Sequence, residues 1–361
     1  MSPSSLPPVD RRSFIKGLAG VGGAALATAY ALPAWAESVF GDPALAVAWK
    51  DQIGLQLFTV RDKFPTDYAG TLQAVAKIGY KQVQPTMNYG GKTPAEVKAI
   101  LDQNGLTAPT THVSPQNGPD LEKTLDAYAS MGHKYTTVNV GGEGRGRGGP
   151  PGGGAGAGAA GAPGARPDSA ARGGATPTET SGAPRPPRAP AAPQTLDAVK
   201  RTAAALNEAG RITQKHGIKV IVHNHTVEFG PLADSTQRPY DVLLAETDPS
   251  LVAMELDIGW AAVAGVKALD LFKQAPGRFE VWHVKDIAGL AALEGKNMSE
   301  RQRAAQIVPV GQGEIDYKPI FAQASAAGLK YFYVEQDSAP ASGDSLAAAA
   351  VSYQALLKTL S

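Results

Sequence analysis

The sequence predicts a (β/α)8 TIM barrel, and three observations point to this fold class. Strand-length apolar runs alternate with helix-length segments, which favours right-handed strand–helix–strand units and a parallel sheet. About eight such repeats occupy roughly 260 residues once one low-complexity segment is set aside, and this length fits a closed barrel better than an open sheet. Several predicted strands also end in polar side chains, as strands of such barrels do at the catalytic face.

The predicted elements alternate along the chain after its N-terminal segment. Four strands come first, at 53–60, 81–85, 107–113 and 135–140, and four more follow, around His223, at 252–257, around His283 and at 331–336. The helices are predicted at 67–78, 94–104, 120–131, 196–216, 240–246, 266–274, 317–327 and 346–360. Gly105 and Gly328 directly follow two of these helices, where glycine commonly ends a helix. The run Val220-Ile221-Val222 has the β-branched composition of a buried parallel strand.

Residues 1–36 have the organisation of an export signal. The pair Arg11-Arg12, an apolar Gly/Ala-rich run from 17 to 32 and the A-x-A sequence Ala34-Trp35-Ala36 follow the order of a secretory signal of the twin-arginine type. The apolar run is too short to span a bilayer comfortably, so we expect no stable membrane insertion, with a retained anchor as the alternative. We therefore predict the twin-arginine (Tat) export machinery as a partner and a periplasmic or secreted barrel at 37–361.

Composition and charge exclude two classes of function. The 361-residue chain has no cysteine, so neither disulfides nor thiolate ligands are available. Its formal charge is +1, and removing residues 1–36, with three basic residues and one acidic residue, leaves about −1. We expect no nucleic-acid partner, because no basic footprint is present.

One stretch, 141–194, differs from the rest because it consists almost entirely of Gly, Ala, Pro, Ser, Thr and Arg. It cannot bury enough apolar surface to offset its ordering entropy, so we expect a disordered insert after strand 4. A linker between two domains and a segment that binds an acidic cell-wall polymer are the alternatives.

Four side chains near the ends of the last four predicted strands could bind one divalent metal ion. Glu228, Asp257, His283 and Glu335 offer three carboxylates and one imidazole, a set that suits Mn²⁺, Mg²⁺, Co²⁺ or Zn²⁺. Each residue alone has an ordinary explanation, such as a solvated carboxylate, a turn cap or a buried core histidine. Their recurrence on consecutive strands is what predicts a shared metal site.

Other polar residues at these strand ends are candidates for catalysis and substrate binding. His223 and His225 are two residues apart and share a face of an extended strand, so either could act as acid or base, or replace Glu228 as a metal ligand. Lys285 could polarise a substrate carbonyl, or pair with Asp286 at the rim. We expect the substrate to be contacted by Gln56, His112, Asn224, Trp260 and Asp286.

Several segments together resemble the sugar phosphate isomerase/epimerase family, the xylose isomerase-like TIM barrels. They are 53–62, 223–229, 255–260, 283–286, 310–317 and 334–337, and they cover the chain from Ile53 to its end apart from the low-complexity insert. Members of that family typically hold one divalent metal ion through a Glu-Asp-His-Glu set. The resemblance maps Asp257, His283 and Glu335 onto the last three ligands and leaves Glu228 or His223 as the first. Gln84 stands where relatives often place a glutamate.

The resemblance implies proton abstraction next to the carbonyl of a sugar through a metal-bound enediolate. A sugar isomerase or epimerase is the expected activity, and a lyase or dehydratase acting on a 3-keto-sugar or keto-glycoside is the alternative. The alternative hypothesis that involves no catalysis is a secreted barrel that binds a sugar. The endonuclease branch is disfavoured because it needs more metal ligands and a basic surface, and a homo-oligomer is left open. No Gly-rich loop forms a phosphate cradle, so a phosphate group on the substrate is not implied.

Overall fold

The computed structural model describes residues 49–140 and 194–361. The predicted export signal at 1–36 lies outside the described residues, and so does the predicted insert at 141–194 apart from its last residue. Within the described part of the chain, no helix is long and apolar enough to cross a membrane.

Eight parallel strands form one sheet, in the order β2-β1-β10-β7-β6-β5-β4-β3. An isolated parallel bridge joins Gln82, in one outer strand of this order, to Thr107, three residues before the other outer strand, so the sheet forms a nearly closed barrel. This confirms the predicted fold class. The strands are β1 (Gly54–Gln56), β2 (Gln82–Gln84), β3 (Thr110–Thr111), β4 (Tyr135–Thr136), β5 (Lys219–His223), β6 (Val252–Asp257), β7 (Val281–Val284) and β10 (Tyr331–Val334).

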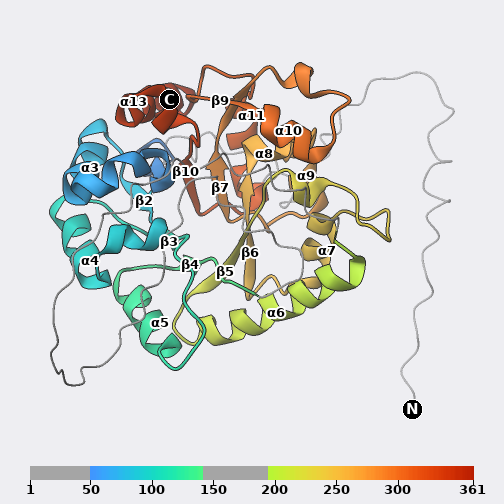
Figure 1. Ribbon diagram of the computed structural model, residues 1–361, viewed down its shortest axis with the longest axis horizontal. Helices are drawn as coiled ribbons and strands as arrows, with labels where there is room; N and C mark the ends of the chain where they lie inside the picture. The colour runs from blue at the N-terminus through green and yellow to red at the C-terminus, as the bar shows by residue number, and fades with distance from the viewer. Residues whose placement is uncertain (1–48, 141–193) are drawn as a thin grey trace, which may run out of the picture. The chain divides into compact units, whose positions relative to one another are not determined.

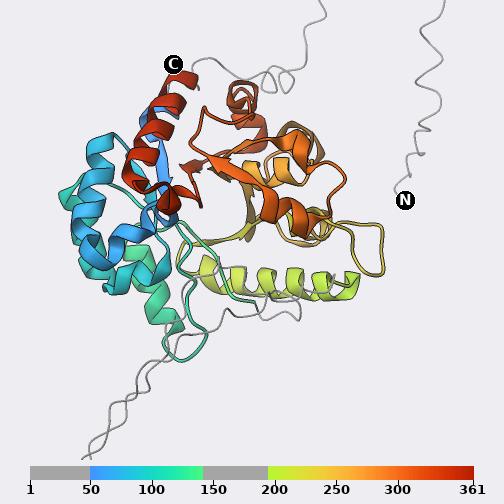
Figure 2. The ribbon, with the colours of Figure 1, turned by 45° about the horizontal axis from the view of Figure 1, so that its top comes forward.

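Helices surround the strands, as Figure 1 shows. The C-terminal helix packs beside the first long helix, which brings the two ends of the barrel repeat together (Figures 1 and 2). The helices are α3 (Phe64–Ile78), α4 (Pro94–Gln103), α5 (Leu121–Ser130), α6 (Leu196–Gln214), α7 (Pro239–Glu246), α8 (Ile258–Val263), α9 (Ala268–Gln274), α10 (Met298–Ala304), α11 (Tyr317–Phe321), α12 (Ala324–Ala327) and α13 (Ser345–Thr359).

The apolar core has two layers because alternate residues of each strand face opposite sides. The larger layer fills the space between strands and helices and includes Leu55, Val83, Leu256 and Phe332. A smaller cluster lies among residues of β4, β5, β6, β7 and β10, and consists of Tyr135, Ile221, Ala253, Val281 and Tyr333. The strands therefore have a filled interior below the point where their polar ends begin.

Several predicted strands are longer than the observed ones. The segment predicted as a strand at 53–60 leaves the sheet after Gln56 and continues as the 3-10 helix η2 (Leu57–Lys63). Strands predicted at 107–113 and 135–140 keep sheet hydrogen bonds at only two residues each, in β3 and β4. The helix predicted at 317–327 is divided into α11 and α12. Apolar patterning identified these segments, but it does not show where backbone hydrogen bonding stops.

A small antiparallel pair of strands, absent from the predicted elements, follows β7. It consists of β8 (Asp286–Ala288) and β9 (Gln306–Val308), with α10 between them. Ile287 of this pair packs with Trp260, Val263 and Leu293 in a separate apolar cluster. The antiparallel pair therefore packs beside α8, the short helix that starts directly after Asp257.

Candidate metal centre

The register of the parallel strands brings the candidate side chains together. His223, the last residue of β5, is the Cα partner of Glu255 in β6. Two residues later in β6, Asp257 is the Cα partner of His283 in β7. Glu335 directly follows β10, whose Tyr333 is paired with His283. Polar ends of neighbouring parallel strands therefore meet at one edge of the barrel.

Four of these residues form a group that could hold a metal ion, which we call the metal group. It consists of His223, Asp257, His283 and Glu335, and their ligand atoms all lie within 4.8 Å of one another. Nδ1 of His283 is 2.8 Å from Oε2 of Glu335 and 3.7 Å from Oδ2 of Asp257. Nε2 of His223 is 4.0 Å from the same Asp257 oxygen. Three of the four are buried, and His223 is partly exposed.

The chemistry of this group fits a divalent cation. Oδ1 of Asp257 accepts the backbone N–H of Trp260, and its buried Oδ2 forms an ion pair with the Lys285 ammonium at 2.9 Å. Two imidazole nitrogens and two carboxylate oxygens are donors that divalent first-row metal ions accept. Buried carboxylates are costly unless cations neutralise them, and Asp257 and Glu335 share the single charge of Lys285, which leaves room for a further positive charge.

Lys285 supplies the fixed positive charge next to the metal group. Its ammonium is buried and lies 2.9 Å from Asp257, 3.0 Å from Glu335 and 2.7 Å from Asp337. The same nitrogen lies 4.7 Å from the centre of the Trp260 ring. Lys285 therefore faces carboxylates, two of them from the metal group, and its predicted contact with a substrate carbonyl stays a prediction.

Mutual attraction keeps Asp257, His283 and Glu335 ionised despite their burial. Burial opposes the charged forms, but Lys285 and His283 together hold the pKa of Glu335 well below its usual value. Burial also opposes protonation of His283, yet Glu255 and Glu335 raise its pKa well above the ordinary range. For His223, burial dominates and lowers the pKa to about 4. His223 is therefore held neutral, whereas His283 is held protonated, which shows that its surroundings favour a positive charge.

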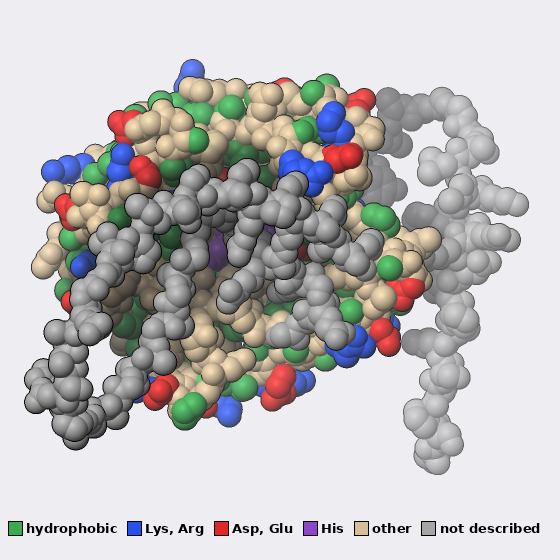
Figure 3. Space-filling model, in the orientation of Figure 1, with side chains coloured by type: hydrophobic (Ala, Val, Ile, Leu, Met, Phe, Trp, Pro, Cys, Tyr) green, Lys and Arg blue, Asp and Glu red, His purple; other side chains and the backbone are tan. Residues whose placement is uncertain are grey.

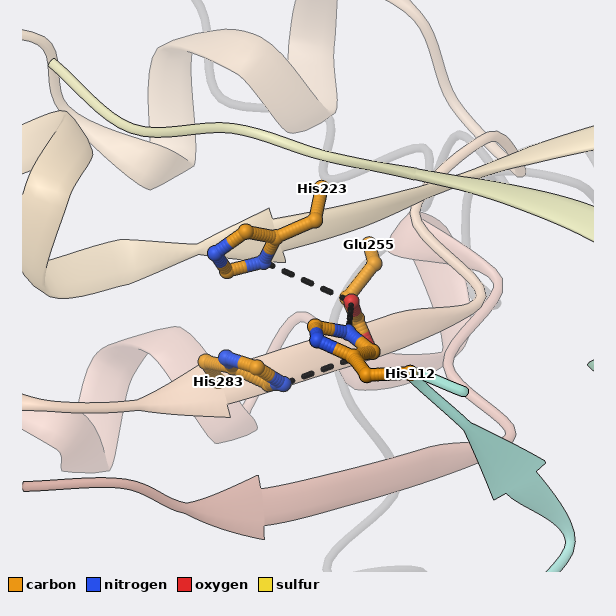
Figure 4. A group of neighbouring side chains, drawn as sticks. All are labelled: His112, His223, Glu255 and His283. Carbon is orange, nitrogen blue, oxygen red and sulfur yellow. Dashed lines mark hydrogen bonds and ion pairs between the residues drawn. The ribbon is translucent and has the colours of Figure 1, made fainter. Parts of the chain in front are cut away.

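A second group of nitrogen and oxygen donors adjoins the first. His112, which follows β3, lies with His223 and His283 around the fully buried carboxylate of Glu255 (Figure 4). Glu255 contacts Nε2 of His112, and its oxygens lie 3.4 Å from Nδ1 of His223 and 3.3 Å from Nε2 of His283. His223 and His283 belong to both groups, because each ring has a nitrogen on either side.

Glu228, predicted as a metal ligand, lies outside both groups. The strand β5 ends at His223, and the 3-10 helix η4 (Val227–Phe229) follows. In this turn a Glu228 oxygen accepts the backbone N–H of His225 at 2.8 Å. Of the two alternatives for the first ligand, the structure brings His223 to the metal group. The ring of His225 stands perpendicular to that of His223, with 4.9 Å between ring centres.

Three residues expected to contact substrate are tied to the metal group or its neighbours. Asn224 is fully buried, and its amide accepts the N–H of Asp257 and donates to the carbonyl of Asp257. Trp260 lies under Lys285 and donates its backbone N–H to Asp257. Nε2 of Gln56 is 3.4 Å from Nδ1 of His112. Asn224 and Trp260 thus hold the candidate ligand Asp257 in position.

Asp286, also expected to contact substrate or pair with Lys285, has a different role. Its carboxylate is 1% exposed and accepts backbone N–H groups of Ile287, Gly311, Gly313 and Ile315. These bonds use both oxygens to anchor the loop after β9. The buried carboxylate therefore leaves no oxygen directed at a substrate, which corrects the expectation.

Glu255 is not among the predicted site residues, although the sequence contains a simple signal for it. Glu255 and Asp257 are two residues apart in β6, so their side chains lie on the same face of the strand. Asp337 was likewise not selected as a partner of Lys285. Gln84, noted only as a departure from the family pattern, is fully buried and bonds both Glu255 and His283.

Histidine side chains are visible near the middle of the face drawn in Figure 3, while the visible charged side chains lie mostly toward its edge. The strand ends that carry the metal group belong to the last four parallel strands along the chain, which are also neighbours in the sheet.

A family model described as the xylose isomerase-like TIM barrel matches residues 167–356. The chain belongs to this family.

Curated relatives of this xylose isomerase-like barrel match part of the chain. The inosose dehydratase of Clostridium tetani is 31% identical over 150 residues, which are 39% of this chain and 49% of the relative. That of Geobacillus thermodenitrificans is 29% identical over 141 residues, 38% of this chain and 46% of the relative. The matches thus span about half the length of these relatives.

A solved structure supports the fold over a longer range. The sugar phosphate isomerase/epimerase from Parabacteroides distasonis superposes with a TM-score of 0.58 at 19% identity. The superposition covers 84% of this chain and 96% of that one. At this level of identity the likeness concerns the fold.

Proposed function

We propose that this protein is a divalent-metal-dependent lyase that removes water, or another β-substituent, from a keto-sugar or keto-cyclitol. The observation that carries the proposal is the convergence of four ligand atoms, from His223, Asp257, His283 and Glu335, within 4.8 Å. The inosose dehydratases among its relatives support a dehydration in preference to the isomerisation that the family resemblance implies.

The proposed metal ion is a first-row transition ion. The sequence alone suggested three carboxylates and one imidazole, but the metal group has two of each. Two imidazoles favour an ion such as Zn²⁺ or Co²⁺ over Mg²⁺, which prefers oxygen ligands, and the two carboxylates also suit Mn²⁺. A bound cation would supply the positive charge that polarises a ketone and stabilises the enediolate formed when the neighbouring carbon loses its proton.

The protein's own side chains would then move the protons. His225 lies beside His223 but outside the metal group, and we propose it as the group that accepts the proton from the carbon next to the ketone. As the C=O bond re-forms, a C=C bond forms between the α- and β-carbons and the C–O bond to the β-substituent breaks. The departing hydroxide takes up the proton that His225 had accepted and leaves as water. Lys285 keeps Asp257 and Glu335 ionised and in place. Export through residues 1–36 remains part of the proposal.

Deuterium exchange tests the first step, and product mass tests the second. We would incubate the purified full chain with Mn²⁺ and an inosose, a 3-keto-glucoside or a free ketose in D₂O. We expect exchange next to the ketone and a product lighter by one water or one aglycone. An unchanged mass with a new stereoisomer or positional isomer would instead identify an isomerase or epimerase.

Asp257→Ala is the decisive variant, and Glu280→Gln is its matched control. Glu280 is a partly buried carboxylate directly before β7, remote in strand position from the metal group. We expect Asp257→Ala to lose about a thousandfold in rate, because metal stabilisation of charge contributes several kcal/mol. Glu280→Gln should keep its activity. A wild-type protein that binds no divalent ion and catalyses no exchange would favour the non-catalytic sugar-binding barrel.

A further inference from the structure

We propose that Glu255, together with Gln84, is a positioning residue that determines which ring nitrogen of three histidines carries the proton. In this arrangement His223 presents Nε2 and His283 presents Nδ1 to the metal ion, while Glu255 itself does not bind the ion. The inference rests on the metal site of the proposed function and assigns the role of the adjoining histidine group.

The surroundings of Glu255 are the first step. Its side chain is completely buried in the middle of β6, yet lies among hydrogen-bond donors. His112, His223 and His283 each turn a ring nitrogen toward it, as Figure 4 shows. An ionised carboxylate can only accept hydrogen bonds, so each nitrogen that faces it is favoured to carry a proton.

Gln84 fixes the proton of His283. The amide nitrogen of Gln84 donates to Glu255 at 2.5 Å and to the hydroxyl of Thr110 at 2.8 Å. This orients the amide so that its oxygen, Oε1, is the atom 2.7 Å from Nε2 of His283. An amide oxygen accepts, so Nε2 must donate. Nδ1 of His283 is then the nitrogen available to a cation beside Glu335 and Asp257.

The same reasoning assigns the other two rings. The anionic oxygen of Glu255 lies 3.4 Å from Nδ1 of His223 and favours the proton there, which leaves Nε2 toward Asp257. His112 donates from Nε2 to Glu255. The Oε1 atom of Gln56 accepts a backbone N–H, so its amide nitrogen is the atom that faces Nδ1 of His112. An acceptor that faces the second nitrogen of a metal-binding imidazole, as Gln84 and Glu255 do here, commonly orients the ring and strengthens metal binding.

The competing interpretation is a second cation held by His112, His223, Glu255 and His283. It would require His223 and His283 to bind one cation through each ring nitrogen, so both rings would lose both protons. The bond from His283 to Gln84 would also be lost. The hydrogen bonds that Gln84 makes to Glu255 and His283 therefore favour one metal ion with Glu255 as a hydrogen-bond acceptor.

The test compares Glu255→Gln with Glu280→Gln in the full chain. We expect one Zn²⁺ per wild-type chain by equilibrium dialysis, and about 10- to 100-fold weaker Zn²⁺ binding in Glu255→Gln, with no change in Glu280→Gln. Long-range ¹H–¹⁵N spectra of histidine-labelled, Zn²⁺-loaded protein should show His223 protonated at Nδ1 and His283 at Nε2. The Glu255→Gln spectrum should lose the His223 pattern, a change that loss of packing alone would not cause.

Gln84→Met keeps the inference testable should Glu255→Gln fail to fold. It removes the acceptor for His283 alone, so the spectrum of His283 should change while that of His223 remains. Unchanged affinity and unchanged ring protonation in both variants would overturn the proposal. Two Zn²⁺ per wild-type chain, with one lost in Glu255→Gln, would also overturn it by making Glu255 a ligand. A wild-type chain that binds no ion overturns the metal site as well, so the two failures are distinguishable.

Discussion

The barrel interior holds charged side chains at both ends, and the same two strands carry them. β5 begins with Lys219 and ends with His223, and β7 follows Glu280 and contains His283. At the N-terminal end, the Lys219 ammonium lies 2.5 Å from one Glu280 oxygen, and the Tyr135 hydroxyl donates to the other at 2.6 Å. At the C-terminal end, donors and acceptors are not matched in this way.

The difference between the ends lies in charge balance. At the N-terminal end, one ammonium and one hydroxyl satisfy one carboxylate. At the C-terminal end, the carboxylates of Asp257, Glu335 and Asp337 gather around a single lysine, Lys285, and Glu255 lies near His283. Buried charge therefore does not by itself mark a functional site. An excess of buried carboxylates over the side-chain cations beside them is what a divalent cation can balance.

Removing the lysine from each end should have the largest effect. In the absence of metal ions, Lys285→Met should lower the free energy of unfolding by about 3–5 kcal/mol, because three carboxylates lose their buried partner. Lys219→Met leaves one partly exposed carboxylate and should cost about 1–3 kcal/mol. Urea unfolding of both variants and the wild type measures this.

Mn²⁺ sharpens this comparison. It should raise the stability of Lys285→Met by more than that of the wild type, because the ion replaces the missing positive charge at Asp257 and Glu335. For Lys219→Met the increment should equal that of the wild type. Equal increments in all three proteins would mean that the ion does not bind beside Lys285.

The fold and most of the metal group can be predicted from the sequence for physical reasons, and the same reasons limit how far such a prediction can go. The bounds of β6 (Val252–Asp257) follow from a mostly apolar run that ends in Asp257. The place of Asp257 at a strand end can therefore be predicted without knowing the loop that follows. Choosing between His223 and Glu228 requires the point where β5 leaves the sheet, and that depends on backbone hydrogen bonds after His223. The role of Glu255 depends on partners from three other strands, which local sequence does not show.

Two histidines at the N-terminal end of the barrel, His133 and His216, should make stability depend on pH in opposite directions. Burial lowers the pKa of His133 to about 4, and both its ring nitrogens contact protein atoms, the Tyr89 hydroxyl and the Ala108 carbonyl. The unfolded chain binds a proton at this position below pH 6.5 that the folded chain does not. Stability from His133 should therefore decline by about 3 kcal/mol as pH falls from 6.5 to 4, and the decline should vanish in His133→Gln.

His216 should show the opposite sign and serves as the control. Burial opposes its charge, but Asp126 and Glu122 contact its two ring nitrogens and raise its pKa. Its contribution is present below pH 6.5 and is lost as pH rises through the raised value. Urea unfolding across pH 4–8, as differences between the wild type and each His→Gln variant, checks both slopes. Two slopes of the same sign would contradict the assigned environments.

The backbone turns of the two ends differ as well, and here the smallest effect is expected. Glycine supplies the positive φ in turns that follow helices at the N-terminal end, as at Gly105 and Gly328. In the described residues, positive φ without glycine occurs only at Met87, Asn88 and Tyr89, in the turn that follows β2. Left-handed backbone costs an L-residue about 1–2 kcal/mol, so this rim turn is strained.

Met87→Gly should relieve part of that strain. The Met87 side chain is 48% exposed, so little packing is lost, and we expect a gain of about 1 kcal/mol after the entropy cost of glycine. Val351→Gly is the control, because Val351 is similarly exposed at 42% but helical, and it should lose about 0.5 kcal/mol. Chemical denaturation measures both signs. A loss in both variants would show that the rim turn stores no strain, and the two ends would then differ in their charges alone.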